Sequence, residues 1–277
     1  MTTRETVPGP APLPAHVDVL IVGAGLSGIG AAYRLQTECP DRSYVILEAR
    51  DALGGTWDLF RYPGIRSDSD MFTLGYPFKP WKDAKAIADG DAILNYIRET
   101  AEEFGIDEQI RLEAKVTSID WVSRDRCWTV TVERGGESAS MTAGFVYVCA
   151  GYYNYDAGYA PEFPGRLNFR GRFVHPQFWP EDLDYDGKKV VVIGSGATAV
   201  TLVPAMASPT THVTMLQRSP TWIAAVSSRE KKADWLRAHL PEQLAHRVAR
   251  AKNVAFNIGF HQFCEWFPTR ARILLQS

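Results

Sequence analysis

The chain has 277 residues, a formal net charge of −2, 45% hydrophobic residues and 22% charged residues. This length allows about two domains, and the small net charge does not favour nucleic acid or an anionic membrane surface as a partner. The apolar runs are all well short of the roughly 20 residues of a membrane span, so we expect no transmembrane segment.

Residues 1–16 are rich in Pro and Thr and contain no apolar segment. They predict a disordered leader rather than a signal peptide. The cysteines are scattered and form no C-x-x-C pair, standing at positions 39, 127, 149 and 264. This argues against a zinc site or a redox disulfide, and we expect no bound metal. A reducing, cytoplasmic location follows as an expectation.

The first recognisable unit has the order strand, glycine turn, helix, strand, which is typical of Rossmann-type dinucleotide binding. The right-handed crossover rule makes its two strands parallel. Its parts are a buried strand at 17–22, the turn Gly23-x-Gly25-x-x-Gly28, a helix at 29–38 and a buried strand at 44–48.

This first turn has the features of a pyrophosphate cradle. Gly23 permits the tight turn, Gly25 lets the backbone approach phosphate, and Gly28 lets the helix pack closely on the strand. Glu48 ends the second strand, 20 residues after Gly28. A carboxylate there accepts hydrogen bonds from ribose hydroxyls and repels a 2′-phosphate, so the site suits FAD or NAD rather than NADP.

The middle of the chain carries mixed signals. A Gly-, Trp- and Asp-rich stretch covers 53–81, and a loop of that length is uncommon unless it binds something. Turn residues stand at 134–136, and a Pro-, Gly- and Tyr-rich connector covers 152–164. The predicted elements are a helix at 84–104, strands at 110–120 and 127–133, and a buried strand at 145–149.

The strand–turn–helix–strand order then recurs, which indicates a second dinucleotide unit in tandem. At the position that matches Glu48 stands Arg218, 19 residues after Ala199. A guanidinium can pair with a 2′-phosphate, so this site suits NADP. The parts are a strand at 189–193, the turn Gly194-x-Gly196-x-x-Ala199, a helix at 200–206 and a strand at 212–217.

From residue 233 onward the pattern is helical, with a break at Leu240-Pro241. Residues 229–252 hold seven Lys or Arg against three Asp or Glu. A helix on a membrane surface is one interpretation of that balance, and a solvated helix face is the favoured one.

Between the two units lies a segment that resembles a family fingerprint. It reads Phe169-x-Gly171-x-x-x-His175-x-x-x-Trp179-Pro180. It is similar to the fingerprint of class B flavin monooxygenases of the Baeyer–Villiger type. Relatives that oxidise amines and sulfides carry Tyr or Phe in place of Trp179. Outside this context, His175 would be interpreted as a structural histidine.

The resemblance extends over nearly the whole chain from residue 17, and the runs 54–70, 149–156 and 179–186 carry it. It implies that Gly54, Gly55, Thr56 and Trp57 lie along FAD. It also implies that Asp68 is an active-site aspartate near the flavin and the nicotinamide.

The resemblance implies an FAD-containing, NADPH-dependent monooxygenase. Such an enzyme inserts one atom of O₂ into a ketone, or into a sulfide or thioamide, through a flavin C4a-peroxide. His175 and Trp179 would govern domain movement. Three alternatives are an N- or S-oxygenating flavin monooxygenase, a nucleotide-binding fragment without activity, and a pyridine nucleotide–disulfide reductase. The missing redox cysteine pair argues against the last. The oligomeric state and the physiological substrate leave no signal in the sequence.

Members of this family are roughly twice as long, so we expect that the chain is a truncated front part. The predicted fold is α/β, with two tandem Rossmann-type domains and the start of a helical insertion. The predicted domains are an FAD-binding domain at 17–154, a linker with the fingerprint at 155–185, and an NADP-binding domain at 186–277 whose insertion starts near 233.

Overall fold

A computed structural model describes residues 12–219, 223 and 227–276. Residues 1–11 of the predicted leader lie outside the described residues. The last residue of the predicted leader, His16, is the first residue of strand β1 (His16–Val22). The chain divides into two compact units, one ending at Leu59 and resuming over Leu94–Tyr159, the other holding Phe60–Ile93 and the residues from Ala160. This division differs from the predicted domain boundaries over residues 60–93, and those boundaries stay a prediction.

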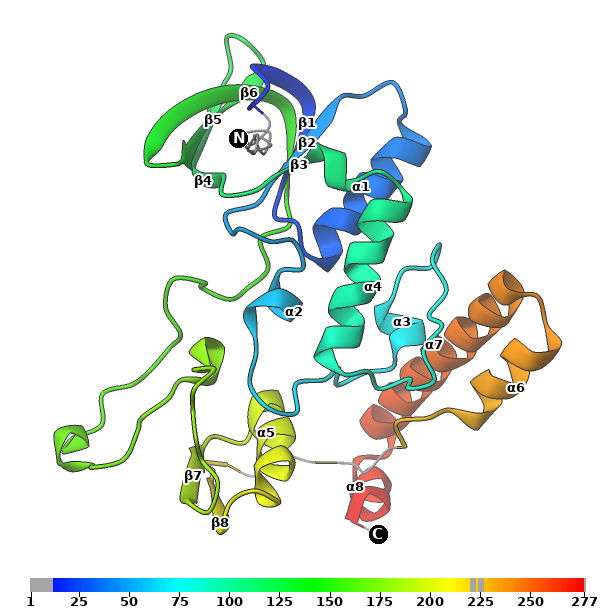
Figure 1. Cartoon of the computed structure of the whole chain (residues 1–277). Coiled ribbons are helices and arrows are strands. Elements are labelled where there is room, and N and C mark those ends of the chain that lie inside the picture. The colour runs from blue at the N-terminus through cyan, green and yellow to red at the C-terminus, as the bar shows by residue number, and fades with distance from the viewer. Residues whose placement is uncertain (1–11, 220–222, 224–226, 277) are drawn as a thin grey trace, which may run out of the picture. The chain divides into compact units, whose positions relative to one another are not determined.

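The first unit is built on a mixed six-stranded sheet (Figure 1). Its strand order is β3-β2-β1-β6-β5-β4, and the neighbours are parallel from β3 to β6 and antiparallel from β6 to β4. Helix α1 packs against β1 and β2. The elements are β1 (His16–Val22), α1 (Leu26–Glu38), β2 (Tyr44–Leu47), α2 (Thr56–Leu59), α4 (Gly90–Glu103), β3 (Ile110–Arg111), β4 (Lys115–Val122), β5 (Cys127–Arg134) and β6 (Glu137–Val148).

The core of this sheet explains why the predicted parallel pair forms. Val19 to Val22 of β1 stand in register with Tyr44 to Leu47 of β2, and Leu20 and Leu47 belong to one buried apolar cluster. The prediction that residues 145–149 form a buried strand is wrong in its burial. Phe145 is 57% exposed, whereas its neighbour Val146 packs against the core.

Two predicted elements are shorter than their sequence patterns suggested. The helix expected over 84–104 begins at Gly90. Residues 86–89 pair with residues 66–71 instead, because Ser67 N–H donates to the Ala88 carbonyl and Met71 N–H to the Ala86 carbonyl. The strand expected over 110–120 is interrupted, since Glu113 takes a positive φ of 53° between β3 and β4.

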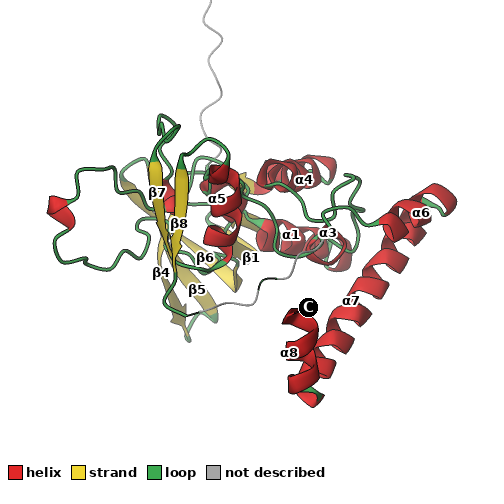
Figure 2. Cartoon of the chain, turned by 90° about the horizontal axis from the view of Figure 1, so that it is seen from below, coloured by secondary structure: helices red, strands yellow, loops and turns green. Residues whose placement is uncertain are grey.

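The second unit contains a two-stranded parallel sheet and a helical region (Figure 2). Helix α5 packs on the two strands, and the predicted break at Leu240-Pro241 separates α6 from α7. The helices and strands are α3 (Met71–Leu74), β7 (Lys189–Ile193), α5 (Ala197–Ala207), β8 (His212–Leu216), α6 (Lys231–His239), α7 (Glu242–Trp266) and α8 (Pro268–Gln276); short 3-10 helices cover Arg166–Asn168 and Pro176–Phe178.

One face of α7 binds the segment that contains α3. Arg250 Nη1 donates to the carbonyls of Phe72, Thr73 and Gly75 at 2.8, 2.9 and 2.8 Å. Asn253, one turn further on, donates to Asp70 Oδ1 at 2.8 Å. The basic stretch 229–252 is therefore more than a solvated helix face. Its Arg250 donates hydrogen bonds to carbonyls at the end of α3 that have no partner within that helix.

Among the described helices, none combines the length and the apolar character that crossing a membrane demands. The described residues also contain no group of three His, Cys, Asp or Glu side chains arranged to hold a metal ion.

Candidate functional site: two dinucleotide turns

Backbone geometry explains the first and third glycines of the first turn. Gly23 takes a φ of 105°, and a Cβ there would stand 2.6 Å from the Cys149 carbonyl oxygen. At Gly28 a Cβ would lie 1.9 Å from the Gly23 carbonyl oxygen. Both positions exclude any side chain, the first through its conformation and the second through the close approach of α1 to the turn.

The middle glycine has a different reason to be small. Gly25 has an ordinary φ of −82° and is the N-cap of α1, with no side-chain hydrogen bond to the helix end. A Cβ there would be 3.6 Å from Gly55 Cα. The first N–H groups of α1 thus emerge beside two glycines without side chains, which is the arrangement that accepts a phosphate.

The stretch after residue 53 contacts this turn. Gly54 N–H donates to the Ala24 carbonyl at 3.0 Å, and Gly54 and Gly55 have φ values of 122° and 57°. Helix α2 starts at Thr56, and Trp57 N–H donates to the Gly54 carbonyl at 3.2 Å. Gly55, Thr56 and Trp57 are therefore brought to the turn that contains Gly25.

Glu48 stands at the carboxyl end of β2 and is only 4% exposed. Its Oε2 accepts from the Ala24 N–H at 2.7 Å, and its Oε1 accepts from the Arg50 N–H at 3.0 Å. Each oxygen of an ionised carboxylate has capacity for a second donor. The side chain is held at the turn by one oxygen and retains acceptor capacity for the hydroxyls of a ribose.

An ion-pair cluster lies beside this turn, and no motif in the sequence predicted it. Asp58 is buried and binds Arg50 at 2.8 Å and Arg98 at 3.0 Å. Arg50 also donates to the Gly55 carbonyl at 3.4 Å. Tyr155 lies 3.4 Å from a Cβ placed on Gly55, and burial raises the pKa of its hydroxyl. The cluster fastens residues 55–58 to the end of β2.

The second turn repeats the geometry of the first with more open space. Gly194 takes a φ of 130°, and its N–H donates to the Leu216 carbonyl at 2.8 Å. Gly196 is the N-cap of α5 without a side-chain bond, and a Cβ on it would meet nothing within 4 Å. Ala199 is buried on α5 at the position that matches Gly28.

The bend that follows β8 is held close to this turn. Ser195 Oγ donates to the Ser219 carbonyl at 3.3 Å, which joins the glycine turn to the bend after β8. Arg218 precedes Ser219 and is exposed. A guanidinium in that place is available to an anion that also binds the N-terminus of α5.

Asp68 lies in the second unit and is exposed. It stands between two anchored neighbours. Ser67 is buried and its Oγ accepts from the Ala88 N–H at 3.0 Å. Asp70 caps α3 by accepting from the Thr73 N–H at 2.9 Å. The backbone on both sides of Asp68 is therefore fixed while its carboxylate faces outward.

The fingerprint residues make local contacts with their sequence neighbours. Gly171 approaches Phe169, because a Cβ on it would stand 2.6 Å from the Phe169 ring. His175 caps the 3-10 helix at Pro176–Phe178, with Nδ1 accepting from the Gln177 N–H at 3.2 Å. Trp179 meets Tyr185 edge to face at 6.0 Å, and the Pro180 carbonyl accepts from the Leu183 N–H. These contacts support a structural part for His175.

Two glycine turns, each opening a helix behind a parallel strand, define an α/β protein with two Rossmann-type units, and the predicted fold class is confirmed. The model of the flavin-binding monooxygenase-like family matches residues 17–239. The chain belongs to this family, which confirms the resemblance inferred from the fingerprint.

Curated relatives agree with this assignment. The FAD-containing monooxygenase EthA of Mycolicibacterium smegmatis is 57% identical over 263 residues, covering 95% of this chain and 54% of that protein. The putative FAD-containing monooxygenase MymA of Mycobacterium tuberculosis is 54% identical, covering 94% of this chain and 54% of that protein. The chain thus spans about half the length of the curated relatives it matches.

Solved structures of similar fold include enzymes that are monooxygenases by name. An oxidised steroid monooxygenase bound to NADP has a TM-score of 0.69 and 31% identity, covering 79% of this chain and 42% of that one. Cyclohexanone monooxygenase from Rhodococcus sp. Phi1 bound to NADP⁺ has a TM-score of 0.70 and 28% identity, covering 82% and 43%.

Proposed function

We propose that this chain supplies the FAD site and the NADPH site of a monooxygenase that inserts one atom of O₂ into a ketone, a sulfide or a thioamide. The observation that carries the proposal is the opposite charge at two equivalent positions. Glu48 would bind the ribose of the dinucleotide at the first turn. Arg218 occupies the equivalent position at the second turn. A carboxylate selects free hydroxyls and a guanidinium selects a 2′-phosphate.

FAD fits the first turn on structural grounds. Its pyrophosphate would bind the N–H groups at the start of α1, in the space that Gly25 and Gly55 leave without side chains. Glu48 would accept hydrogen bonds from the adenosine ribose. Thr56 and Trp57 would lie along the dinucleotide, held there by the bonds of Asp58 to Arg50 and Arg98.

NADPH fits the second turn. Its pyrophosphate would bind the start of α5 at Gly196, and Ala199 would let that helix pack on the strand. Arg218 would pair with the 2′-phosphate. Together the two cofactors would supply hydride transfer to the flavin and activation of O₂.

Residues outside the turns would position the reacting groups. Asp68 would orient the nicotinamide and set the charge near it, because its neighbours Ser67 and Asp70 fix its backbone. Within the fingerprint, His175 and Trp179 would govern domain movement. Names of the relatives support the monooxygenase class, and the substrate is proposed from the resemblance alone.

The test uses two substitutions, one for each proposed cofactor site. Glu48→Gln should purify with depleted flavin, whereas the exposed control Glu38→Gln should retain it. Arg218→Ala should raise the KM for NADPH about 10- to 100-fold, through loss of a charge-assisted phosphate contact, and change that for NADH little. The control Arg229→Ala should leave both unchanged. Full flavin in Glu48→Gln together with unaltered NADPH kinetics in Arg218→Ala would refute the assignment of both sites.

A further inference from the structure

One side chain of the connector that follows β6 lies on the first glycine turn. Residues 151–154, 156 and 157 are exposed, whereas Tyr155 is half-buried. A Cβ placed on Gly55 would stand 3.4 Å from the Tyr155 hydroxyl oxygen and 3.1 Å from Gly25 Cα. The tip of the phenol therefore borders the space that these two glycines leave without side chains.

Side chains around the turn hold the phenol in this orientation. The Thr56 side chain shares a hydrogen bond with the Tyr155 hydroxyl. The guanidinium carbon of Arg50 lies 5.9 Å from the centroid of the ring, within the range of a cation–π contact. Arg50 is itself fixed by its ion pair with Asp58 at 2.8 Å. The phenol is thus preorganised, so it would bind a ligand without a large ordering cost.

An ion pair ties the backbone beside Tyr155 to the same region. Asp156 Oδ2 binds Lys115 Nζ at 2.9 Å. Lys115 follows Ala114, whose N–H donates to the Glu48 carbonyl at 2.8 Å. An exposed ion pair of this kind adds little stability, but it restricts where the connector can lie. The connector is therefore attached to the carboxyl end of β2, where Glu48 stands.

The Tyr155 hydroxyl is suited to donate to an anion at this point. Burial raises its pKa, which keeps the hydroxyl protonated. A phenol hydroxyl both donates and accepts, so it can accept from Thr56 and donate its own hydrogen to another group. The first N–H groups of α1 emerge beside Gly25 and would bind a phosphate in the same space. Phosphate oxygens are charged acceptors, and hydrogen bonds to charged acceptors are the stronger ones.

We propose that Tyr155 is a further FAD-binding residue, whose hydroxyl donates a hydrogen bond to the pyrophosphate beside Gly25 and Gly55. The inference rests on the proposed function, because it takes FAD as the occupant of the first turn. Helix α1 supplies backbone donors to the phosphates, and the connector adds one donor from a side chain. The connector is then part of the cofactor site and not only a link in the chain.

Removal of one hydroxyl tests this contact. The affinity of flavin-free protein for FAD is measured by titration, and the phosphorus resonances of bound FAD are recorded by ³¹P NMR. Tyr155→Phe keeps the ring and its contact with Arg50, so it should fold as the wild type does. It should bind FAD about 10- to 100-fold more weakly and shift at least one phosphorus resonance. Tyr159→Phe, which removes a hydroxyl from an 88% exposed side chain of the same connector, should match the wild type in both measurements.

The phosphorus spectrum separates a direct contact from a structural part for Tyr155. A loss of affinity with unmoved phosphorus resonances would overturn the proposal, since the hydroxyl would then act only through Thr56 and its loop. Wild-type affinity in Tyr155→Phe would overturn it as well. If Glu48→Gln is depleted of flavin in the same series, either failure concerns Tyr155 alone and the proposed FAD site stands. Wild-type protein that binds no FAD would overturn both the role of Tyr155 and the proposed function.

Discussion

Adding one methyl group at Gly25 should separate cofactor binding from folding. Gly25 has a φ of −82°, which any residue adopts, and the new Cβ would stand 3.6 Å from Gly55 Cα, an ordinary contact. Alanine is a poorer N-cap than glycine, but it also reduces the freedom of the unfolded chain. These effects oppose each other, so Gly25→Ala should change the free energy of unfolding by less than about 1 kcal/mol.

The same methyl group would occupy the space proposed for the pyrophosphate. We expect Gly25→Ala to remain folded and to lose FAD affinity by at least about tenfold, or about 1.4 kcal/mol. Gly28→Ala is the contrasting variant. Its Cβ would lie 1.9 Å from the Gly23 carbonyl oxygen, and a backbone atom cannot move aside cheaply. Overpacking of this severity should destabilise the protein by about 3 kcal/mol or more.

The assay combines urea unfolding with titration of FAD into protein freed of flavin. Gly25→Ala should unfold at the wild-type urea concentration and bind FAD weakly. Gly28→Ala should unfold at a clearly lower concentration. If Gly25→Ala binds FAD with wild-type affinity, the backbone at position 25 does not approach the cofactor and the assignment of the first turn is wrong.

Two further predictions concern α7. Arg250→Met should lower the free energy of unfolding by about 2–3 kcal/mol, because three carbonyls lose a charged donor, whereas the exposed control Arg247→Met should change it little in the same urea assay. Burial lowers the folded-state pKa of His246, so the unfolded chain binds the extra proton first. Stability should therefore fall as the pH drops below about 6.5, the ordinary value for histidine. His246→Gln should lose this part of the pH dependence, and equal pH profiles would refute the argument.

The local sequence pattern was sufficient for the parts of the fold that depend on neighbouring residues. The glycine spacing at 23, 25 and 28 predicts the turn because its backbone conformation and its close helix approach exclude side chains. The apolar runs predict β1 and β2, because a buried strand requires a continuous run of apolar residues. β7 and β8 also form where the pattern predicted strands, although Val191 and Ile193 are exposed. The opposite charges of Glu48 and Arg218 led to the prediction of FAD at the first turn and NADP at the second. This inference was possible from the sequence because the charge of a side chain is known without the rest of the fold.

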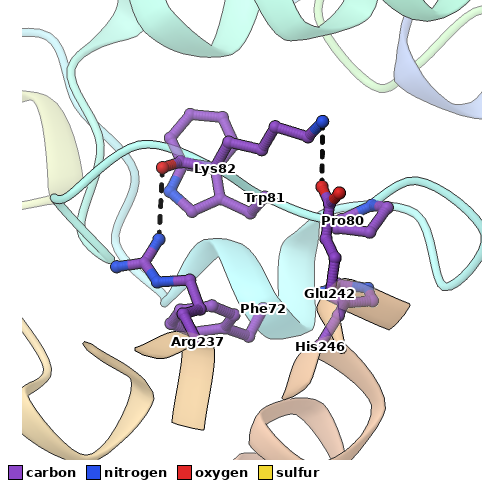
Figure 3. A pocket seen from close by; sticks show the side chains of 7 residues that line it. All are labelled: Phe72, Pro80, Trp81, Lys82, Arg237, Glu242 and His246. Atoms are coloured by element: carbon purple, nitrogen blue, oxygen red, sulfur yellow. Dashed lines mark hydrogen bonds and ion pairs between the residues drawn. The ribbon is translucent and has the colours of Figure 1, made fainter. Parts of the chain in front are cut away.

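Pairing between distant segments was decided only by the tertiary structure. Residues 86–89 belong to a helical sequence pattern but pair with residues 66–71. Phe145 of β6 belongs to an apolar run but is exposed. The bonds of Arg50 and Arg98 to Asp58 and of Arg250 to the end of α3 join residues up to 178 positions apart. Hydrogen bonds and ion pairs of this kind depend on which surfaces meet, and no periodicity along the chain records that. The cavity lined in part by Phe72, Trp81 and His246 exists for the same reason, because its walls come from α3, the loop at 80–82, α6 and α7 (Figure 3).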